Sequence, residues 1–182
     1  MHRLMDNYGE PLSCRGKKEY FDDMIYFLRR DHFDESMTRG IEEYGNELWR
    51  MMARCTSGFC HGDMHTGNTK YLGGQFIWKD FDRAGLSYPV YDLSWLANCT
   101  DFVVFNEKAL NVSRRLFDEI YAGYCVEQTM TDNDIVAVFH FIAIIHLDAN
   151  DIILKNRTVD RSFMAQQHDW LMRWREACGK LA

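Results

Sequence analysis

The sequence predicts an α+β fold that is mainly helical and carries one small β-hairpin. Three observations lead to this fold class. Apolar residues recur at helical spacing through long segments in the first and last thirds of the chain. Two glycines separate a pair of short β-prone runs in the middle, which is typical of a tight hairpin. Apolar residues also make up 47% of the 182 positions, enough for a chain of this length to bury a core.

The first third is expected to contain two helices. Residues 1–16 are predicted to be irregular, because two glycines and a proline interrupt this segment. Residues 17–30 and 34–54 repeat apolar positions every three or four residues, and each is predicted to form a helix that packs on the core.

The middle of the chain carries the β-prone segments. Residues 59–62 are a candidate short strand. Residues 69–72 and 75–79 are the two predicted strands of the hairpin, with the glycine pair at its turn. Gly85 and Pro89 then mark a loop.

The rest of the chain is predicted to be helical. Four helices are expected, at 90–99, at 106–124, from Thr131 to about 154, and at 162–178. Thr131 and Asp134 resemble a capping box, with Asp in place of the usual Glu. The helix that follows is apolar almost all round, which indicates that it is buried on most sides.

Composition and charge exclude several classes of protein. With 21 Lys and Arg against 27 Asp and Glu, the net charge is -6, which disfavours a nucleic-acid partner. No stretch approaches 18 uninterrupted apolar residues, so we expect no membrane partner. The N-terminus lacks the apolar segment of a secretory signal, and the six cysteines contain no C-x-x-C pair. We therefore expect reduced thiols and a cytoplasmic location.

Three polar side chains flank the predicted hairpin. Asp63 and Asn68 precede it, and Asp80 follows it. Because a hairpin returns the chain to its starting edge, we expect these side chains to converge. Carboxylate and amide oxygens suit Mg²⁺, and Mg²⁺ suits nucleotide phosphates. A carboxylate that does not bind metal can accept the proton of an attacking hydroxyl.

The spacing of these residues resembles a known family. His61-Gly62-Asp63 with Asn68 is similar to the kinase catalytic loop H-R-D-x-x-x-x-N, and Asp80-Phe81-Asp82 is similar to the metal-binding D-F-G. Pro89-Val90-Tyr91-Asp92-Leu93 follows as a P-x-x-D-L run. Together these motifs resemble the aminoglycoside phosphotransferase and choline kinase family.

The resemblance implies a protein-kinase-like C-terminal lobe at 17–182, with a catalytic loop at 61–68 and a metal loop at 80–82. The family also has an N-terminal lobe with a glycine-rich strand pair. That lobe is expected to be absent, because the roughly 60 residues before His61 are predicted to be helical and no G-x-G-x-x-G occurs in the chain.

The resemblance also assigns catalytic and metal-binding roles. Asp63 would be the catalytic base. Asn68 and Asp80 would hold the Mg²⁺ that accompanies ATP, and Asp82 would assist at the metal. His61 would brace the catalytic loop.

Further roles implied by the family concern support and substrate. Asp92 would accept hydrogen bonds from backbone amides of the catalytic loop, and Gly62 and Gly67 would permit tight turns. Asp148 and Asp151, at the polar end of the apolar helix, would bind an amine-bearing substrate. The alternative is that these two acidic residues simply face solvent.

The function implied is transfer of the ATP γ-phosphate to a hydroxyl of a small molecule, such as an aminoglycoside, choline or homoserine-like acceptor. Without an N-terminal lobe the site would be incomplete, and a partner chain or a second copy would cover the open face. One alternative is a non-catalytic kinase-like binding or regulatory module. Another is a zinc-binding protein that uses Cys55, Cys60, His61 and His65.

Overall fold

The computed structural model describes residues 1–6, 8–156 and 160–181, so the last residue of the predicted 17–182 lobe lies outside the described residues. The α-helices are α1 (His2–Met5), α2 (Asp23–Arg30), α3 (Glu35–Met52), α4 (Pro89–Ala97), α5 (Ala109–Tyr124), α6 (Asp132–Asn156) and α7 (Arg161–Gly179). A π-helix, η1 (Lys18–Asp22), and a 3₁₀-helix, η2 (Thr66–Asn68), add to these. The strands are β1 (Gly58–Cys60), β2 (Thr69–Leu72), β3 (Gln75–Trp78) and β4 (Gly85–Ser87).

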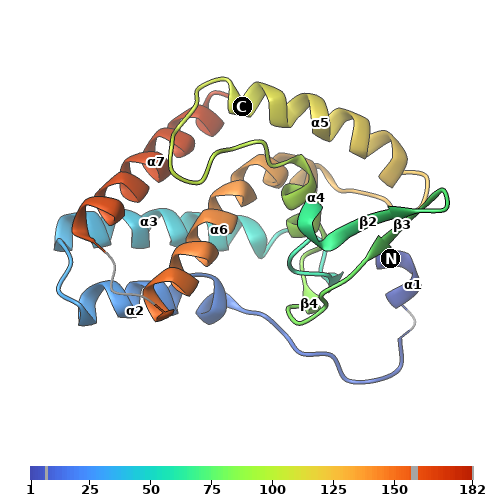
Figure 1. The fold of residues 1–182 in the computed structure, drawn as a ribbon, viewed down its shortest axis with the longest axis horizontal. Helices are drawn as coiled ribbons and strands as arrows, with labels where there is room; N and C mark the ends of the chain where they lie inside the picture. Colours follow the sequence, from blue (N-terminus) through green and yellow to red (C-terminus); the bar gives the residue numbers. More distant parts are fainter. Residues whose placement is uncertain (7, 157–159, 182) are drawn as a thin grey trace.

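Helix α6 lies at the centre of the molecule. It packs against α4, α2, α3 and α7, and most of its apolar side chains belong to the main hydrophobic core (Figure 1). By length and composition Asp132–Lys155 could cross a membrane, since its most apolar 18-residue window has a mean hydropathy of 1.6. However, 72% of its most apolar window is buried inside the protein, which is the behaviour of a core helix.

The predicted capping box at the start of α6 is confirmed. The backbone N–H and the hydroxyl of Thr131 donate to the Asp134 carboxylate, and the Asp134 N–H donates to Thr131 Oγ1 at 3.2 Å. The same carboxylate accepts hydrogen bonds from the N–H and the hydroxyl of Thr56, both at 2.8 Å. Asp134 therefore joins the start of the core helix to the segment that leads into β1.

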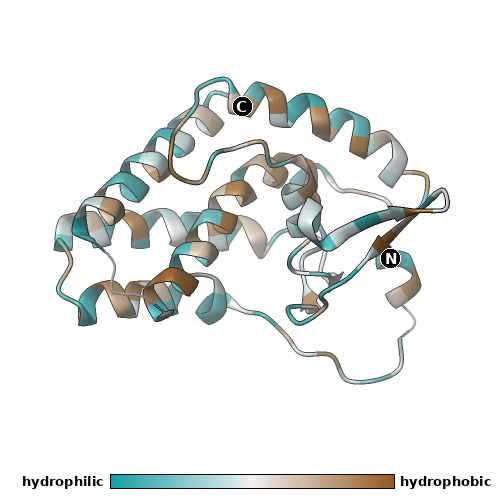
Figure 2. Cartoon of the chain, in the orientation of Figure 1, coloured by the Kyte–Doolittle hydropathy of each residue, from teal (hydrophilic) through white to brown (hydrophobic). Residues whose placement is uncertain are grey.

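The predicted hairpin is also confirmed. Strands β2 and β3 pair antiparallel, with Thr69 opposite Trp78 and Leu72 opposite Gln75. The glycines at its turn have φ of 59° and 83°, which L side chains rarely adopt. Figure 2 shows apolar residues along this hairpin, which extends from the helical part of the molecule.

A second small sheet replaces the loop expected around Gly85. Strand β4 pairs antiparallel with β1, and Gly58 lies opposite Ser87. Leu86 N–H also donates to the Ser13 carbonyl at 2.7 Å, so the N-terminal segment runs along β4. The prediction was wrong because three residues that begin with glycine carry no period, and their pairing comes from distant segments.

The expectation of an irregular segment at 1–16 is wrong for residues 2–5, which form α1. A helix of four residues is unstable by its own propensity and leaves no periodic signal in the sequence. Its contacts with distant residues hold it: Arg3 pairs with Glu127 at 2.7 Å, and His2 is buried.

Candidate active site

The hairpin brings its two flanking loops to the same end. Residue Asn68 immediately precedes β2, and Lys79 immediately follows β3. The Lys79 N–H donates to the Asn68 carbonyl at 3.0 Å, so backbone pairing continues one residue beyond the hairpin. Asp80 comes next in the chain. The turn therefore places the metal loop beside the end of the catalytic loop.

Asp63 and Asn68 are in direct contact. The Asn68 side-chain amide donates to Asp63 Oδ2 at 3.0 Å and to the Asp63 carbonyl at 3.1 Å. Asn68 is buried, whereas the Asp63 side chain keeps 23% of its surface exposed. The buried amide thus fixes the orientation of a carboxylate that solvent or a ligand can still reach.

His61 links the catalytic loop to the metal loop. Its Nε2–H donates to the Lys79 carbonyl at 3.0 Å, and its Nδ1 accepts from the Asp63 N–H at 3.3 Å. The carbonyl can only accept, which places the ring proton on Nε2. The imidazole also lies 4.5 Å from the Phe81 ring, centroid to centroid. His61 therefore contacts both loops from a fully buried position.

The Asp92 side chain hydrogen-bonds to the backbone at the start of the catalytic loop. This fully buried carboxylate accepts the N–H of His61 at 2.6 Å and the N–H of Gly62 at 2.9 Å. Hydrogen bonds to an ionised acceptor are stronger than neutral ones. The loop backbone is thereby tied to α4, which packs on the central helix α6.

The two loop glycines serve different needs. Gly62 has a φ of 81°, and a Cβ added there would lie 2.4 Å from the Arg83 carbonyl oxygen. Both the left-handed backbone and the close approach require glycine. Gly67 is not left-handed; a Cβ there would lie 2.6 Å from the His65 ring.

The donor set at the hairpin end fits Mg²⁺. Asp80 and Asp82 are exposed, and among the described residues no hydrogen bond or ion pair engages either carboxylate. The Asn68 side-chain amide donates to Asp63, and its side-chain oxygen, Oδ1, accepts no hydrogen bond within the described part of the chain. These are hard oxygen ligands. Asp80 also has a φ of 65°, a conformation that is costly for a non-glycine residue and typical of functional sites.

The geometry counts against the zinc alternative. Within residues 1–6, 8–156 and 160–181, no three His, Cys, Asp or Glu side chains form a metal-binding group, so neither the four candidate zinc ligands nor Asp63, Asp80 and Asp82 form a complete site by themselves. Cys55 and Cys60 are buried, and burial raises the pKa of both thiols. Zinc is bound by thiolates, so these environments disfavour it.

Asp148 does not face solvent. Its side chain is 3% exposed and accepts hydrogen bonds from Arg15 Nη2 at 3.0 Å, from the Tyr91 hydroxyl at 2.9 Å and from Arg83. Burial lowers the pKa of Arg15, but the charge and hydrogen bond of Asp148, together with Tyr20 and Tyr91, outweigh burial, and the net pKa is raised. The solvent-facing alternative is wrong because α6 continues past this position and its neighbours cover it.

Asp151 lies one turn further along α6 and is also buried. Its Oδ2 accepts from Lys155 Nζ at 2.6 Å, and its Oδ1 has no hydrogen-bond partner. Burial raises the pKa of Asp151, and Lys155 offsets this only in part.

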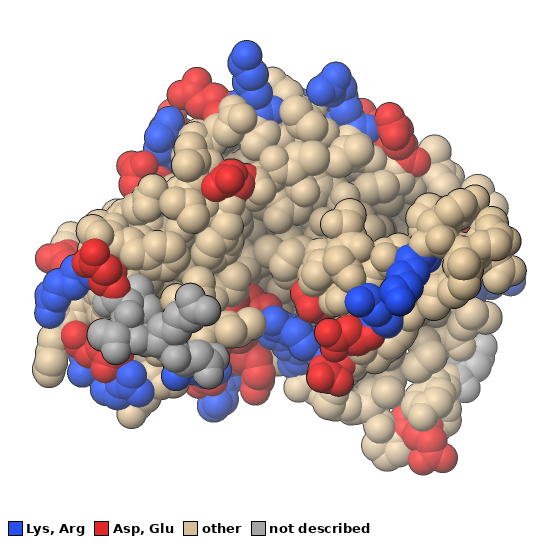
Figure 3. All heavy atoms as spheres, viewed as in Figure 1, with Lys and Arg blue, Asp and Glu red and all other residues tan. Residues whose placement is uncertain are grey.

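Both carboxylates border a cleft of about 290 Å³ that reaches the metal loop. Asp82 and Arg83 line its other side. In Figure 3, acidic and basic side chains meet in the hollow between the helices and the hairpin. The structure thus brings Asp148 and Asp151 to the same cleft as Asp82.

Sequence reasoning missed the basic residues of this cleft. Arg83 directly follows the D-F-D motif, a position that signals a role beside the metal loop. Arg15 lies in a segment without any periodic pattern, and its ion pair with Asp148 shows its place in the structure.

Most of the candidate site residues lie in the part of the chain that matches one protein family. Residues 9–127 match the phosphotransferase enzyme family (APH), and this range includes the catalytic loop, the metal loop and the P-x-x-D-L run. An uncharacterized protein of Deinococcus radiodurans is 33% identical over 89 residues, which are 47% of this chain and 25% of that protein.

Two solved structures share the fold. Amicoumacin kinase hAmiN, in complex with AMP-PNP, Ca²⁺ and Ami, superposes on 100% of this chain with a TM-score of 0.69 and 17% identity. Choline kinase from Cryptosporidium parvum superposes on 99% with a TM-score of 0.61 and 12% identity. The predicted kinase-like fold class is confirmed. The chain spans 59% and 62% of these two proteins and a quarter of the Deinococcus protein.

Proposed function

The chain belongs to the phosphotransferase enzyme family, and on this basis we propose that it carries the catalytic half of an ATP-dependent small-molecule kinase. The observation that carries this proposal is the contact of Asn68 with the Asp63 carboxylate, at the end of the hairpin from which Asp80 emerges. Phosphoryl transfer needs little beyond positioning and electrostatic stabilisation, and this cluster supplies the groups for both.

In the proposed reaction Asp63 is the base. The acceptor hydroxyl oxygen forms a bond to the γ-phosphorus, the bond from phosphorus to the bridging oxygen of ADP breaks, and Asp63 takes the hydroxyl proton. Asn68 holds the carboxylate in place for this transfer. His61 and Asp92 keep the loop backbone fixed, so that the carboxylate need not reorganise during the reaction.

The proposed metal ligands are the side-chain oxygen of Asn68 and the carboxylate of Asp80. Asp82 lies nearby in the sequence. Mg²⁺ bound there would offset the charge on the nucleotide phosphates. The Ca²⁺ and AMP-PNP bound to amicoumacin kinase support a divalent cation and a nucleotide as the cofactors.

We place the acceptor in the cleft of about 290 Å³ beside the metal loop. The ion pairs of Asp148 already satisfy its carboxylate, so its proposed role changes from direct binding to holding Arg15 and Arg83 in the cleft wall. The acceptor amine would instead meet Asp82, whose carboxylate is exposed. Asp151 lies in the cleft wall, where its carboxylate is paired with Lys155. An amine-bearing acceptor fits this arrangement.

A lobe outside this chain would complete the site. About 40% of each similar kinase lies beyond the superposed region. The hairpin also exposes large apolar side chains: Tyr71 is 67% exposed, Leu72 70% and Phe76 69%. Exposed apolar patches favour association. We propose that the nucleotide-covering lobe packs here, whether it is supplied by a longer chain, a partner or a second copy.

The thiols support a location in the cytoplasm. All six cysteines are free, and Cys14, Cys99 and Cys125 are exposed. Exposed thiols persist in a reducing compartment.

The test is phosphate transfer by the purified chain. With Mg²⁺ and ATP, and at chain concentrations at which a second copy can cover the open nucleotide face, we expect ³¹P NMR to show phosphorylation of at least one acceptor among aminoglycosides, choline and homoserine. Asp63→Asn should lower the rate about 10²–10⁴-fold, because general-base catalysis contributes on that order. Asp80→Asn should weaken Mg²⁺-dependent nucleotide binding. Asp118→Asn, at an exposed site on α5, is the matched control.

The outcomes separate the alternatives. If Asp63→Asn turns over as fast as wild type, the assignment of the base is wrong. If the chain binds nucleotide with Mg²⁺ in calorimetry but transfers no phosphate, it is the non-catalytic binding module. If it neither binds nor transfers, the proposal for this chain alone fails.

A further inference from the structure

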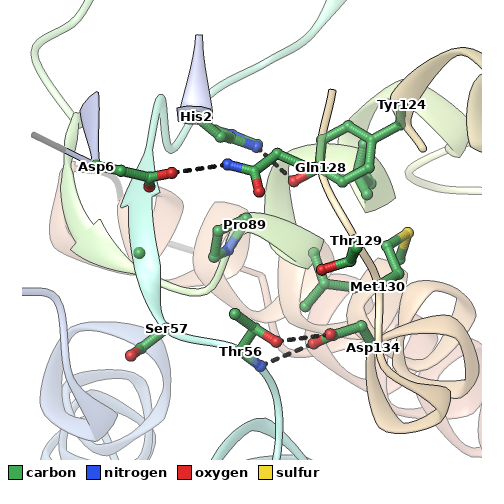
Figure 4. Close-up of a pocket in the computed structure, with 13 residues that line it drawn as sticks. His2, Asp6, Thr56, Ser57, Pro89, Tyr124, Gln128, Thr129, Met130 and Asp134 are labelled. Atoms are coloured by element: carbon green, nitrogen blue, oxygen red, sulfur yellow. Dashed lines mark hydrogen bonds between the residues drawn. The ribbon is translucent and has the colours of Figure 1, made fainter. Parts of the chain in front are cut away.

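The first helix of the chain reaches the support of the catalytic loop. His2, on α1, is buried, and its Nε2 lies 2.9 Å from Asp92 Oδ2. Its Nδ1 lies 2.9 Å from the Tyr124 hydroxyl at the end of α5. Figure 4 shows the His2 ring and the Tyr124 hydroxyl directed toward each other. One imidazole therefore connects three elements that are far apart in the sequence.

The partners of His2 determine where its proton lies. An ionised carboxylate only accepts, so Nε2 carries the hydrogen that points to Asp92. Burial raises the pKa of Tyr124, so its hydroxyl keeps its proton and can donate to Nδ1. Both ring nitrogens of His2 then have a hydrogen-bond partner, and the ring has a single favoured orientation.

His2 shares its carboxylate oxygen with the catalytic loop. Asp92 Oδ2 accepts both from His2 Nε2 and from the His61 N–H, while Oδ1 accepts from the Gly62 N–H. We propose that His2 is a positioning residue for the catalytic loop: it fixes the Asp92 carboxylate in the orientation that holds both amides.

Other contacts keep His2 in this position. Arg3 pairs with Glu127 at 2.7 Å, and the Gln128 amide donates to Asp6 at 3.0 Å (Figure 4). These bonds tie both ends of α1 to the segment after α5. The first helix is therefore docked independently of the His2–Asp92 bond.

A cavity lies beside His2 and makes the hydrogen bond between His2 and Asp92 important for the loop. The cavity has a volume of about 180 Å³ and is lined by His2, Tyr124 and Asp134, among others. It is large enough for water. Without the imidazole, water from the cavity would compete for Asp92 Oδ2, and the carboxylate would no longer have one fixed orientation. Removing the imidazole should therefore weaken the hydrogen bonds of the His61 and Gly62 amides and leave the rest of the protein unchanged.

The catalytic importance of His2 rests on the proposed function, but its positioning can be measured without substrate. The measurement is amide hydrogen exchange by NMR on the intact chain. We expect the His61 and Gly62 amides to exchange roughly tenfold faster in His2→Ala, because local opening there becomes easier. His2→Gln, whose amide can still donate to Asp92, should restore most of the protection. Asp118→Asn, at an exposed site on α5 away from His2, is the control.

Each result decides the proposal. Unchanged exchange at His61 and Gly62 in His2→Ala overturns it, and so does an equal increase throughout α6, which would make His2 a general stability residue. If His2→Ala does not fold, Tyr124→Phe removes only the hydroxyl that orients the ring, and unchanged exchange at the two amides overturns the proposal. If His2→Ala loses protection at the His61 and Gly62 amides but the wild-type chain transfers no phosphate, the positioning role of His2 stands and only the proposed function is refuted.

Discussion

The position of Gly62 allows a quantitative test of the catalytic loop. In Gly62→Ala the new methyl group meets two obstacles. The backbone φ of 81° costs a non-glycine residue about 1–2 kcal/mol. The Cβ would also lie 2.4 Å from the Arg83 carbonyl oxygen, so the two loops must separate. Overpacking of this kind costs about 1–3 kcal/mol. Alanine also reduces the conformational entropy of the unfolded chain, which raises the free energy of unfolding by about 0.4–1 kcal/mol. The sum of these contributions is a net loss of about 1–5 kcal/mol.

Gly74→Ala is the matched control. Gly74 has a φ of 83°, but nothing lies within 4 Å of a Cβ added there. The substitution therefore carries the conformational cost alone, which is about 1 kcal/mol after the effect on the unfolded chain. The difference between the two variants isolates the contact between Gly62 and the Arg83 carbonyl.

Urea denaturation followed by circular dichroism measures both variants. We expect Gly62→Ala to lose at least about 1 kcal/mol more free energy of unfolding than Gly74→Ala, with m values unchanged. Equal losses would refute the reasoning, since they would show that the loops can separate at no cost. Phosphate transfer should fall in Gly62→Ala at temperatures where it remains folded, and stay unchanged in Gly74→Ala.

Two further predictions concern stability. Burial lowers the pKa of His146 from 6.5 to about 3, so below pH 6.5 the unfolded chain binds a proton that the folded protein does not. Stability from this group is complete above pH 6.5 and falls by about 1.4 kcal/mol per pH unit, or about 2 kcal/mol at pH 5. His146→Phe, which can keep the ring stacked on Trp170, should remove this part of the pH dependence in urea titrations; an unaltered pH dependence would contradict the assignment. Asp134→Ala removes the acceptor for Thr131 and Thr56 and should lower the free energy of unfolding by about 3 kcal/mol, and a loss below about 1 kcal/mol in the same assay would show that water replaces the carboxylate.

Local signals in the sequence were sufficient to predict the hairpin and the capping box. The glycine pair specifies the hairpin turn, and Thr131 with Asp134 specifies the start of α6. Both depend on residues within a few positions of one another, so their geometry can be derived before the fold is known. The same holds for the contact between Asp63 and Asn68, which are five residues apart.

Long-range contacts explain what the sequence did not predict. Asp148 lies near the end of an apolar helix and reads as a solvent-facing residue. Its partners Arg15, Arg83 and Tyr91 come from three other segments, and no local pattern links them. The short helix α1 is a similar case, because tertiary contacts form it rather than propensity.

The central position of α6 has a consequence for how the protein is made. As the nascent chain leaves the ribosome, α2, α3 and α4 emerge before α6, but α7 emerges only after it. Until α7 is synthesised, the side of α6 that it covers is open, on a helix whose most apolar 18-residue window has a mean hydropathy of 1.6. Exposed apolar surface of this kind makes partly synthesised chains prone to aggregation. We therefore expect chains that stop before α7 to aggregate more readily than chains that include it.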